Sequence, residues 1–125
     1  MNRALEEVEA PGAVYAVSSI VHLIVGAPCP PPLDGYLWNW DGAPGSDVPH
    51  APPTAVTRLV QAMLNRGVHL MGGRAIVSAV HTDAEIDRTV AAFRGALDQM
   101  LEEGVITRGR ETGAHAAALP PAGGA

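Results

Sequence analysis

Residues 67–104 read GVHLMGGRAIVSAVHTDAEIDRTVAAFRGALDQMLEEG, and this stretch decides the fold. Residues 75–80 are a short apolar, mostly β-branched run that follows a Gly-Gly pair, a pattern that predicts a largely buried strand. A helix comes next, because Thr82 and Glu85 have the spacing of a capping box and Asp83 adds negative charge at the positive end of the helix dipole. The sequence therefore predicts a strand that leads directly into a helix.

The predicted helix is amphipathic and about five or six turns long, ending at Gly104. Its apolar residues recur at helical spacing: Ile86, Val90, Phe93, Leu97, Met100 and Leu101. Charged residues fill much of the opposite face, so the apolar stripe is expected to pack on the preceding strand. A strand and a helix packed in this way form a unit of an α+β layer.

A second helix is predicted over residues 54–66, with Thr54 as its cap and Gly67 at its end. Its apolar stripe is Val56, Leu59, Val60, Met63 and Leu64. Residues 68–71 are expected to form a short strand that pairs with 75–80 as a hairpin across the Gly72-Gly73 turn.

Two further strands are expected near the start of the chain, over residues 14–17 and 19–25, the second of them central because nearly all its residues are apolar. Residues 1–10 can form a short helix that frays, as if it were the exposed end of something longer. The predicted architecture is one α+β domain over residues 1–106, with a long Pro/Gly loop at 26–53 and a disordered tail at 107–125. The loop has five large hydrophobic anchors: Leu33, Tyr36, Leu37, Trp38 and Trp40.

Charge and cysteine content exclude several classes of function. The formal net charge of the 125 residues is −5, and all basic residues are Arg, without any cluster, which argues against nucleic acid and against anionic membranes as partners. The apolar run 13–25 is shorter than the roughly 20 residues that cross a bilayer. A single Cys29 and an acidic N-terminus that does not look like a secretory signal predict a cytoplasmic protein.

The candidate chemical groups are few. The five histidines do not have the spacing of a metal site, and Ser18, Ser19 and Ser78 lack the partners of a hydrolase triad, so no metal ligand and no catalytic residue is predicted. His81, at the strand-to-helix junction, either bonds local backbone or acts catalytically, and its position favours the first.

Gly72, Gly73 and Arg74 can form a small substrate-binding element. Two glycines let backbone approach a ligand, and the Arg74 guanidinium can bind a carboxylate in a fork. A tight turn with a surface arginine is the simpler interpretation when these three residues are considered alone.

One part of the chain resembles a known family. Residues 63–97, MLNRGVHLMGGRAIVSAVHTDAEIDRTVAAFRGAL, are similar to the C-terminal small domain of pyridoxal-phosphate-dependent class III aminotransferases, especially the glutamate-semialdehyde aminomutase-like branch. The matching positions are Leu64, Gly67, Val68, Ser78, His81, Thr82, Glu85, Ile86 and Asp87. Residues 17–23 also resemble a strand of that family, so the resemblance covers about residues 1–104.

The resemblance implies a fold for this chain and a separate, preceding domain that holds the cofactor. The fold is a small antiparallel sheet covered by helices, as in the C-terminal small domain of fold-type I pyridoxal-phosphate enzymes. The family binds pyridoxal 5'-phosphate as a Schiff base on a lysine of a preceding large domain and usually works as a homodimer. This chain has no lysine, so it cannot hold the cofactor covalently or act alone.

The expected function is therefore that of the C-terminal portion of a class III aminotransferase or aminomutase-like protein, with the large domain or a related subunit as its partner. Where the aminomutases carry an acidic residue, this chain has Gly72-Gly73-Arg74, which makes Arg74 the candidate contact for a substrate carboxylate. Two alternatives stay open: a non-catalytic, stand-alone module that binds a partner or a related full-length subunit, and a small free-standing enzyme that uses His81 and Arg74.

Overall fold

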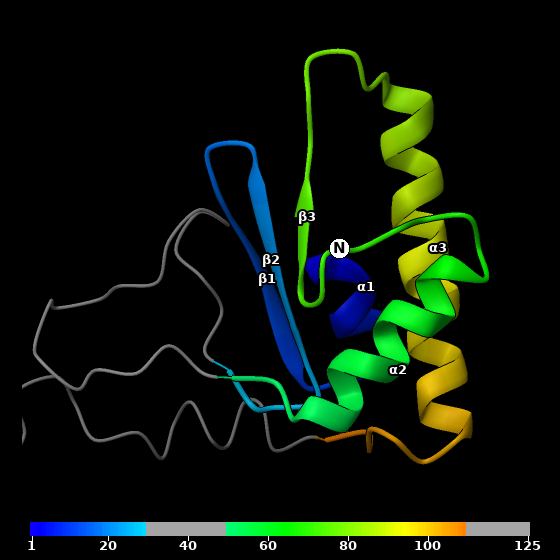
Figure 1. Cartoon of the computed structure of the whole chain (residues 1–125). Helices are drawn as coiled ribbons and strands as arrows, with labels where there is room; N and C mark the ends of the chain where they lie inside the picture. Colours follow the sequence, from blue (N-terminus) through cyan, green and yellow to red (C-terminus); the bar gives the residue numbers. More distant parts are fainter. Residues whose placement is uncertain (30–49, 110–125) are drawn as a thin grey trace, which may run out of the picture.

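Three helices lie on one side of a three-stranded antiparallel sheet in the computed structural model of the chain (Figure 1). The structure describes residues 1–29 and 50–109. In chain order the elements are α1 (Asn2–Glu7), β1 (Gly12–Val17), β2 (Ile20–Val25), α2 (Pro53–Leu64), β3 (Arg74–Ile76) and α3 (Asp83–Glu102). The predicted α+β class, with a small antiparallel sheet covered by helices, is confirmed.

The sheet has the order β1-β2-β3, so the strand predicted to be central is central. Val17 pairs with Ile20 across a two-residue turn, Ser18-Ser19, in which Ser18 has a φ of 54°. Ser18 and Ser19 therefore lie in a turn and not on a strand. A left-handed residue at this place suits the twist of a tight hairpin.

The prediction of a buried strand over residues 75–80 is wrong. β3 ends at Ile76, lies at the edge of the sheet and is mostly exposed; of its three residues only Ala75 packs against the core. The run is apolar although most of its side chains are exposed, and an apolar run does not by itself show whether it is buried. The expected hairpin with residues 68–71 is also wrong, since only Met71 bridges to Arg74 around a Gly72 turn with a φ of 63°.

The main core lies between the sheet and the helices. Val14, Leu23 and Val25 point from the strands toward this side, where the helices that contact the strands are α1 and α2. The largest side chains that are fully buried are Phe93, Leu59, Met63, Leu70, Leu97, Met100 and Val25. Because successive strand residues point to opposite faces, their neighbours along the strands, including Tyr15 and His22, lie on the other face of the sheet.

Helix α3 begins and ends as predicted. Thr82 is its N-cap, and Thr82 and Glu85 form the reciprocal capping box, in which the Thr82 amide donates to the Glu85 carboxylate. That hydrogen bond, followed by one from the Thr82 side chain, lowers the pKa of Glu85. Gly104 follows the helix with a φ of 71°.

The apolar stripe of α3 is buried only in its second half. Ala92, Phe93, Ala96, Leu97 and Met100 are buried, whereas Ile86 is 41% exposed. In Figure 1 the first turns of α3 stand beyond the region where α1 and α2 cover the sheet. The expectation that the stripe packs on the preceding strand is therefore wrong: the buried part of the stripe packs against α2 and α1, and Ile86 is outside the core.

Helix α2 begins one residue earlier than predicted. Its N-cap is Pro52 and Pro53 occupies the first turn, so Thr54 is not the cap. The buried face is Ala55, Leu59, Ala62 and Met63. Leu64, placed on the apolar stripe from its spacing, is 56% exposed.

Helix α1 is anchored to the sheet and is not the loose end predicted from its length. Leu5 and Val8 are buried in the main core. The Asn2 side chain pairs with the edge of β1, donating to the Val14 carbonyl at 2.7 Å and accepting from the Val14 amide at 2.8 Å. A side-chain amide that pairs with a strand in this way satisfies backbone groups at an open sheet edge.

Two other predictions fall largely outside the described residues: most of the loop at 26–53, with Trp38 and Trp40, and most of the tail at 107–125. The described part of the tail reaches Gly109, whose amide donates to the Glu9 carbonyl at 3.1 Å. Within the described ranges, no helix is long and apolar enough to span a membrane.

Candidate functional site

The sheet face turned away from the helices carries a polar row that crosses all three strands. Tyr15 on β1 is in register with His22 on β2, and His22 is in register with Arg74 on β3. Residues that are directly opposite on neighbouring strands have side chains within contact distance of one another. A phenol, an imidazole and a guanidinium therefore lie side by side.

These three residues line an open hollow of about 530 Å³ on this face of the sheet. Its other lining residues are Leu23, Ile24, His50, Ala51, Val56 and Gly73. The Gly73 carbonyl accepts a hydrogen bond from the Leu23 amide at 2.8 Å, which fixes the turn before Arg74 against β2. The hollow is thus lined by apolar side chains, by the backbone of Gly73 and by one permanently charged side chain, Arg74.

The rings of Tyr15 and His22 are stacked, with centroids 4.6 Å apart and planes 6° from parallel. Burial, and then the positive charge of Arg74, lowers the pKa of His22, and burial raises the pKa of Tyr15. Both rings are therefore uncharged at neutral pH. Among the described residues the Arg74 guanidinium has no hydrogen-bond or ion-pair partner, so it can bind a carboxylate that enters the hollow.

A small apolar cluster of Ala13, Ile24 and Cys29 adjoins this row on the same face. The Cys29 thiol is buried, donates to the Ala27 carbonyl at 3.2 Å, and has its pKa raised by burial to about 11. A thiol with so high a pKa is protonated at neutral pH and is a poor nucleophile. Cys29 is accordingly a packing residue.

Only some of the site residues predicted from the sequence line the hollow. Arg74 and Gly73 line the hollow, while Gly72 forms the turn beside it without lining it. The His81 Nδ1 accepts a hydrogen bond from the Ser78 amide at 3.0 Å, so the local role favoured for His81 is confirmed. Sequence reasoning did not select Tyr15 or His22, because their place on one face depends on the register between β1 and β2.

Exposed branched side chains gather at one end of the molecule, which we call the apolar tip. It comprises Val17, Ile20, Ile76, Val80 and Ile86, from 39% to 81% exposed. Val17, Ile20 and Ile76 form one row across the sheet by register, next to the polar row. In Figure 1 the tip is the uppermost end, where the β1–β2 turn, the connection after β3 and the start of α3 lie.

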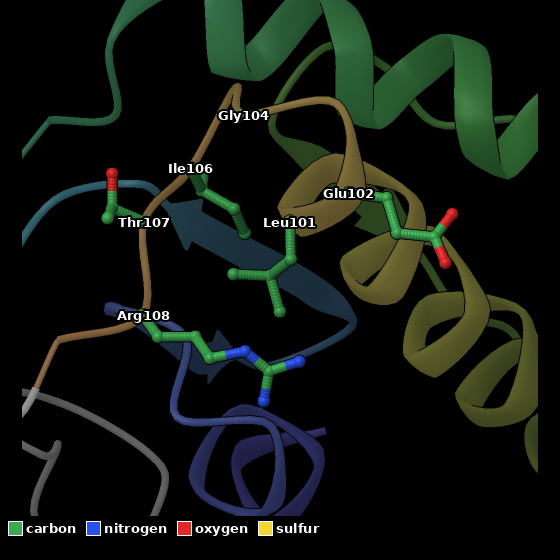
Figure 2. A pocket seen from close by; sticks show the side chains of 6 residues that line it. All are labelled: Leu101, Glu102, Gly104, Ile106, Thr107 and Arg108. Atoms are coloured by element: carbon green, nitrogen blue, oxygen red, sulfur yellow. The ribbon is translucent and has the colours of Figure 1, made fainter.

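A second hollow, of about 400 Å³, lies where the chain turns away from the end of α3 (Figure 2). Leu101 and Ile106 supply its apolar lining; in the figure Arg108 lies beside them, and the Glu102 carboxylate points away. Its remaining lining residues are Gly104 and Thr107. This hollow lies at the C-terminal end of α3.

Residues 1–29 and 50–109 contain no group of three or more His, Cys, Asp or Glu side chains that could hold a metal ion. No protein-family model matches the chain, and no solved structure matches it. The site is thus defined by its own geometry: an arginine, a histidine and a tyrosine in one row beside an open hollow.

Proposed function

We propose that this chain is the C-terminal, small-domain portion of a pyridoxal-phosphate-dependent class III aminotransferase or aminomutase-like protein. Its role is to close over the substrate side of a cofactor that a large domain holds. The complete protein transfers an amino group on an amino acid or on a keto or aldehyde substrate. The observation that carries the proposal is the exposed Arg74 guanidinium, which lies beside a hollow on the sheet face opposite the main core.

The positions that carry the family resemblance occupy consistent places in the fold. Leu64 ends α2 and Gly67 follows with a φ of 83°. His81 and Thr82 form the entry to α3, where Thr82 and Glu85 make the capping box. A motif whose residues serve as a helix stop and a helix start supports a shared local structure, while chemistry must come from the site.

Pyridoxal phosphate does not fit this chain by itself. The hollow offers guanidinium, imidazole and phenol groups, but the sequence has no lysine to form the Schiff base. The amine of Met1 is not a substitute, because Met1 packs against the helix-side core, across the sheet from the hollow. The cofactor is therefore assigned to the large domain, and this chain contributes substrate contacts only.

Within this proposal Arg74 binds a carboxylate of the substrate. Arg74→Ala in the complete enzyme should raise the substrate KM about tenfold or more, since a charge-assisted hydrogen bond is worth about 1.5–3 kcal/mol. Cofactor affinity should be unchanged. Arg58→Ala is the matched control, because Arg58 is exposed and its guanidinium bonds only Gln61, one turn along α2. Equal losses of substrate and cofactor affinity, or equal effects of the two variants, would reject this role for Arg74.

The apolar tip favours a second candidate function, a non-catalytic module that binds a partner or a related full-length subunit. Five branched apolar side chains exposed at one end form a surface of the kind that proteins use for association. The two functions differ in what the partner carries. A lysine-bearing cofactor domain supports the enzyme portion, and a partner without cofactor supports the module.

A further inference from the structure

We infer that His22 is a second, pH-dependent cationic group of the Arg74 site, so that the hollow binds anionic ligands more tightly when His22 is protonated. The inference rests on the proposed role of Arg74 as a carboxylate contact and extends it to the regulation of that contact. It concerns the described chain itself and can be tested without cofactor.

His22 lies next to the groups that would determine pH-dependent anion binding in the hollow. It lies on the central strand, between Tyr15 on one side and Arg74 on the other, and all three line the same hollow. An anion held by the Arg74 guanidinium therefore lies within reach of the His22 imidazole as well. The stacked Tyr15 ring presents a π face on which an imidazolium is tolerated.

The charges around His22 explain why its protonation depends on a ligand. Arg74 repels an imidazolium from β3, Tyr15 on β1 is neutral, and the segment before α2 contributes the titratable His50. No described residue that lines the hollow is a carboxylate. The lowered pKa of His22 fits this setting, and a bound anion supplies the missing negative charge.

Linkage fixes the sign and size of the effect. If protonation of His22 tightens anion binding, a bound anion must raise the pKa of His22 by the same coupling. A unit charge about 6 Å from an anion in water-like surroundings changes affinity about threefold, and partial burial increases the change. Binding should therefore be at least about threefold tighter below the His22 pKa than above it.

The test uses the full 125-residue chain with two probes, acetate and sulfate. Affinity is measured by NMR titration at about pH 5 and about pH 8, which bracket the ordinary histidine pKa. Sulfate keeps its charge over this range, so a change in affinity reports on the protein. We expect tighter binding of sulfate at the lower pH, and a rise in the His22 pKa, read from its ring protons, when sulfate is added; acetate at pH about 8 tests whether a carboxylate binds at Arg74.

Three variants separate the possible outcomes. His22→Gln should bind sulfate equally at both pH values, His50→Gln should keep the pH dependence, and Arg74→Gln should lose most binding at both. Arg74-dependent binding in the unmodified chain that does not change with pH would overturn the inference and leave the role of Arg74 intact. Binding that ignores Arg74→Gln, or no binding at any pH, would overturn both. A His22 pKa that does not respond to sulfate contradicts the inference even if His22→Gln fails to fold.

Discussion

The two halves of α3 should respond very differently to loss of an apolar side chain. Phe93 is fully buried in the main core, and its replacement by Ala removes that packing and leaves a cavity, at a cost of about 3–5 kcal/mol in the free energy of unfolding. Ile86 is 41% exposed and lies in the first nine residues of the helix, none of which is buried. Ile86→Ala should therefore cost about 1 kcal/mol or less.

Urea unfolding of the chain, followed by far-UV circular dichroism, measures both values. Phe93→Ala removes much of the stability that a small domain has, so Phe93→Leu, at about 1–2 kcal/mol, keeps the comparison measurable if the Ala variant does not fold. Equal costs at the two positions would mean that the first turns of α3 are packed within this chain. The apolar tip would then not be a free surface, and the reasoning that assigns it to a partner would be refuted.

Three further predictions follow from single positions. Gly12→Ala should destabilise the chain by about 3 kcal/mol or more, because a Cβ there would lie 2.2 Å from a carbonyl oxygen of β2. At Gly67 a Cβ meets no atom within 4 Å, so Gly67→Ala should cost only about 1–2 kcal/mol for its positive φ. Thermal unfolding that ranks the two variants in reverse would contradict this prediction. Iodoacetamide should label Cys29 slowly at neutral pH and quickly once urea unfolds the chain, and rapid labelling of the folded protein would contradict its burial and raised pKa. Unfolding midpoints should fall on acidification, because a lowered pKa makes the folded state bind fewer protons than the unfolded state. The fall should begin below about pH 6.5 for His22, and below about pH 4.5, through its lowered pKa, for Glu85. A midpoint that does not change between neutral pH and pH about 5 would contradict the His22 shift, and one that does not fall further below pH about 4.5 would contradict the Glu85 shift.

The elements with local signals were predictable from the sequence. The Thr82–Glu85 spacing placed the start of α3, and Gly104 placed its end, because caps depend on residues within one turn. The β-branched residues of 14–25 predicted two strands, and their apolar content placed β2 at the centre. The local hydrogen bond of His81 followed from its position at a junction.

The errors came from features that only tertiary packing decides. A run such as Ile76 to Val80 is equally apolar at an edge and in a core, so its burial could not be read from composition. The anchoring of α1 depends on Asn2 reaching Val14, a contact between separate elements. The polar row was not predicted because it requires the register of three strands, which brings Arg74 beside residues more than fifty positions earlier in the chain.

The central claim is that this chain completes a site whose cofactor is held by a lysine elsewhere. The most direct test is borohydride reduction of the native protein purified from its host, followed by the intact mass of the polypeptide that contains residues 67–104 and of whatever co-purifies with it. The proposal predicts a phosphopyridoxyl group on a lysine, either in a polypeptide well above 12.9 kDa that includes these residues or in a subunit bound to them. A 12.9 kDa polypeptide without any phosphopyridoxyl-bearing partner would contradict the proposal and favour the non-catalytic module.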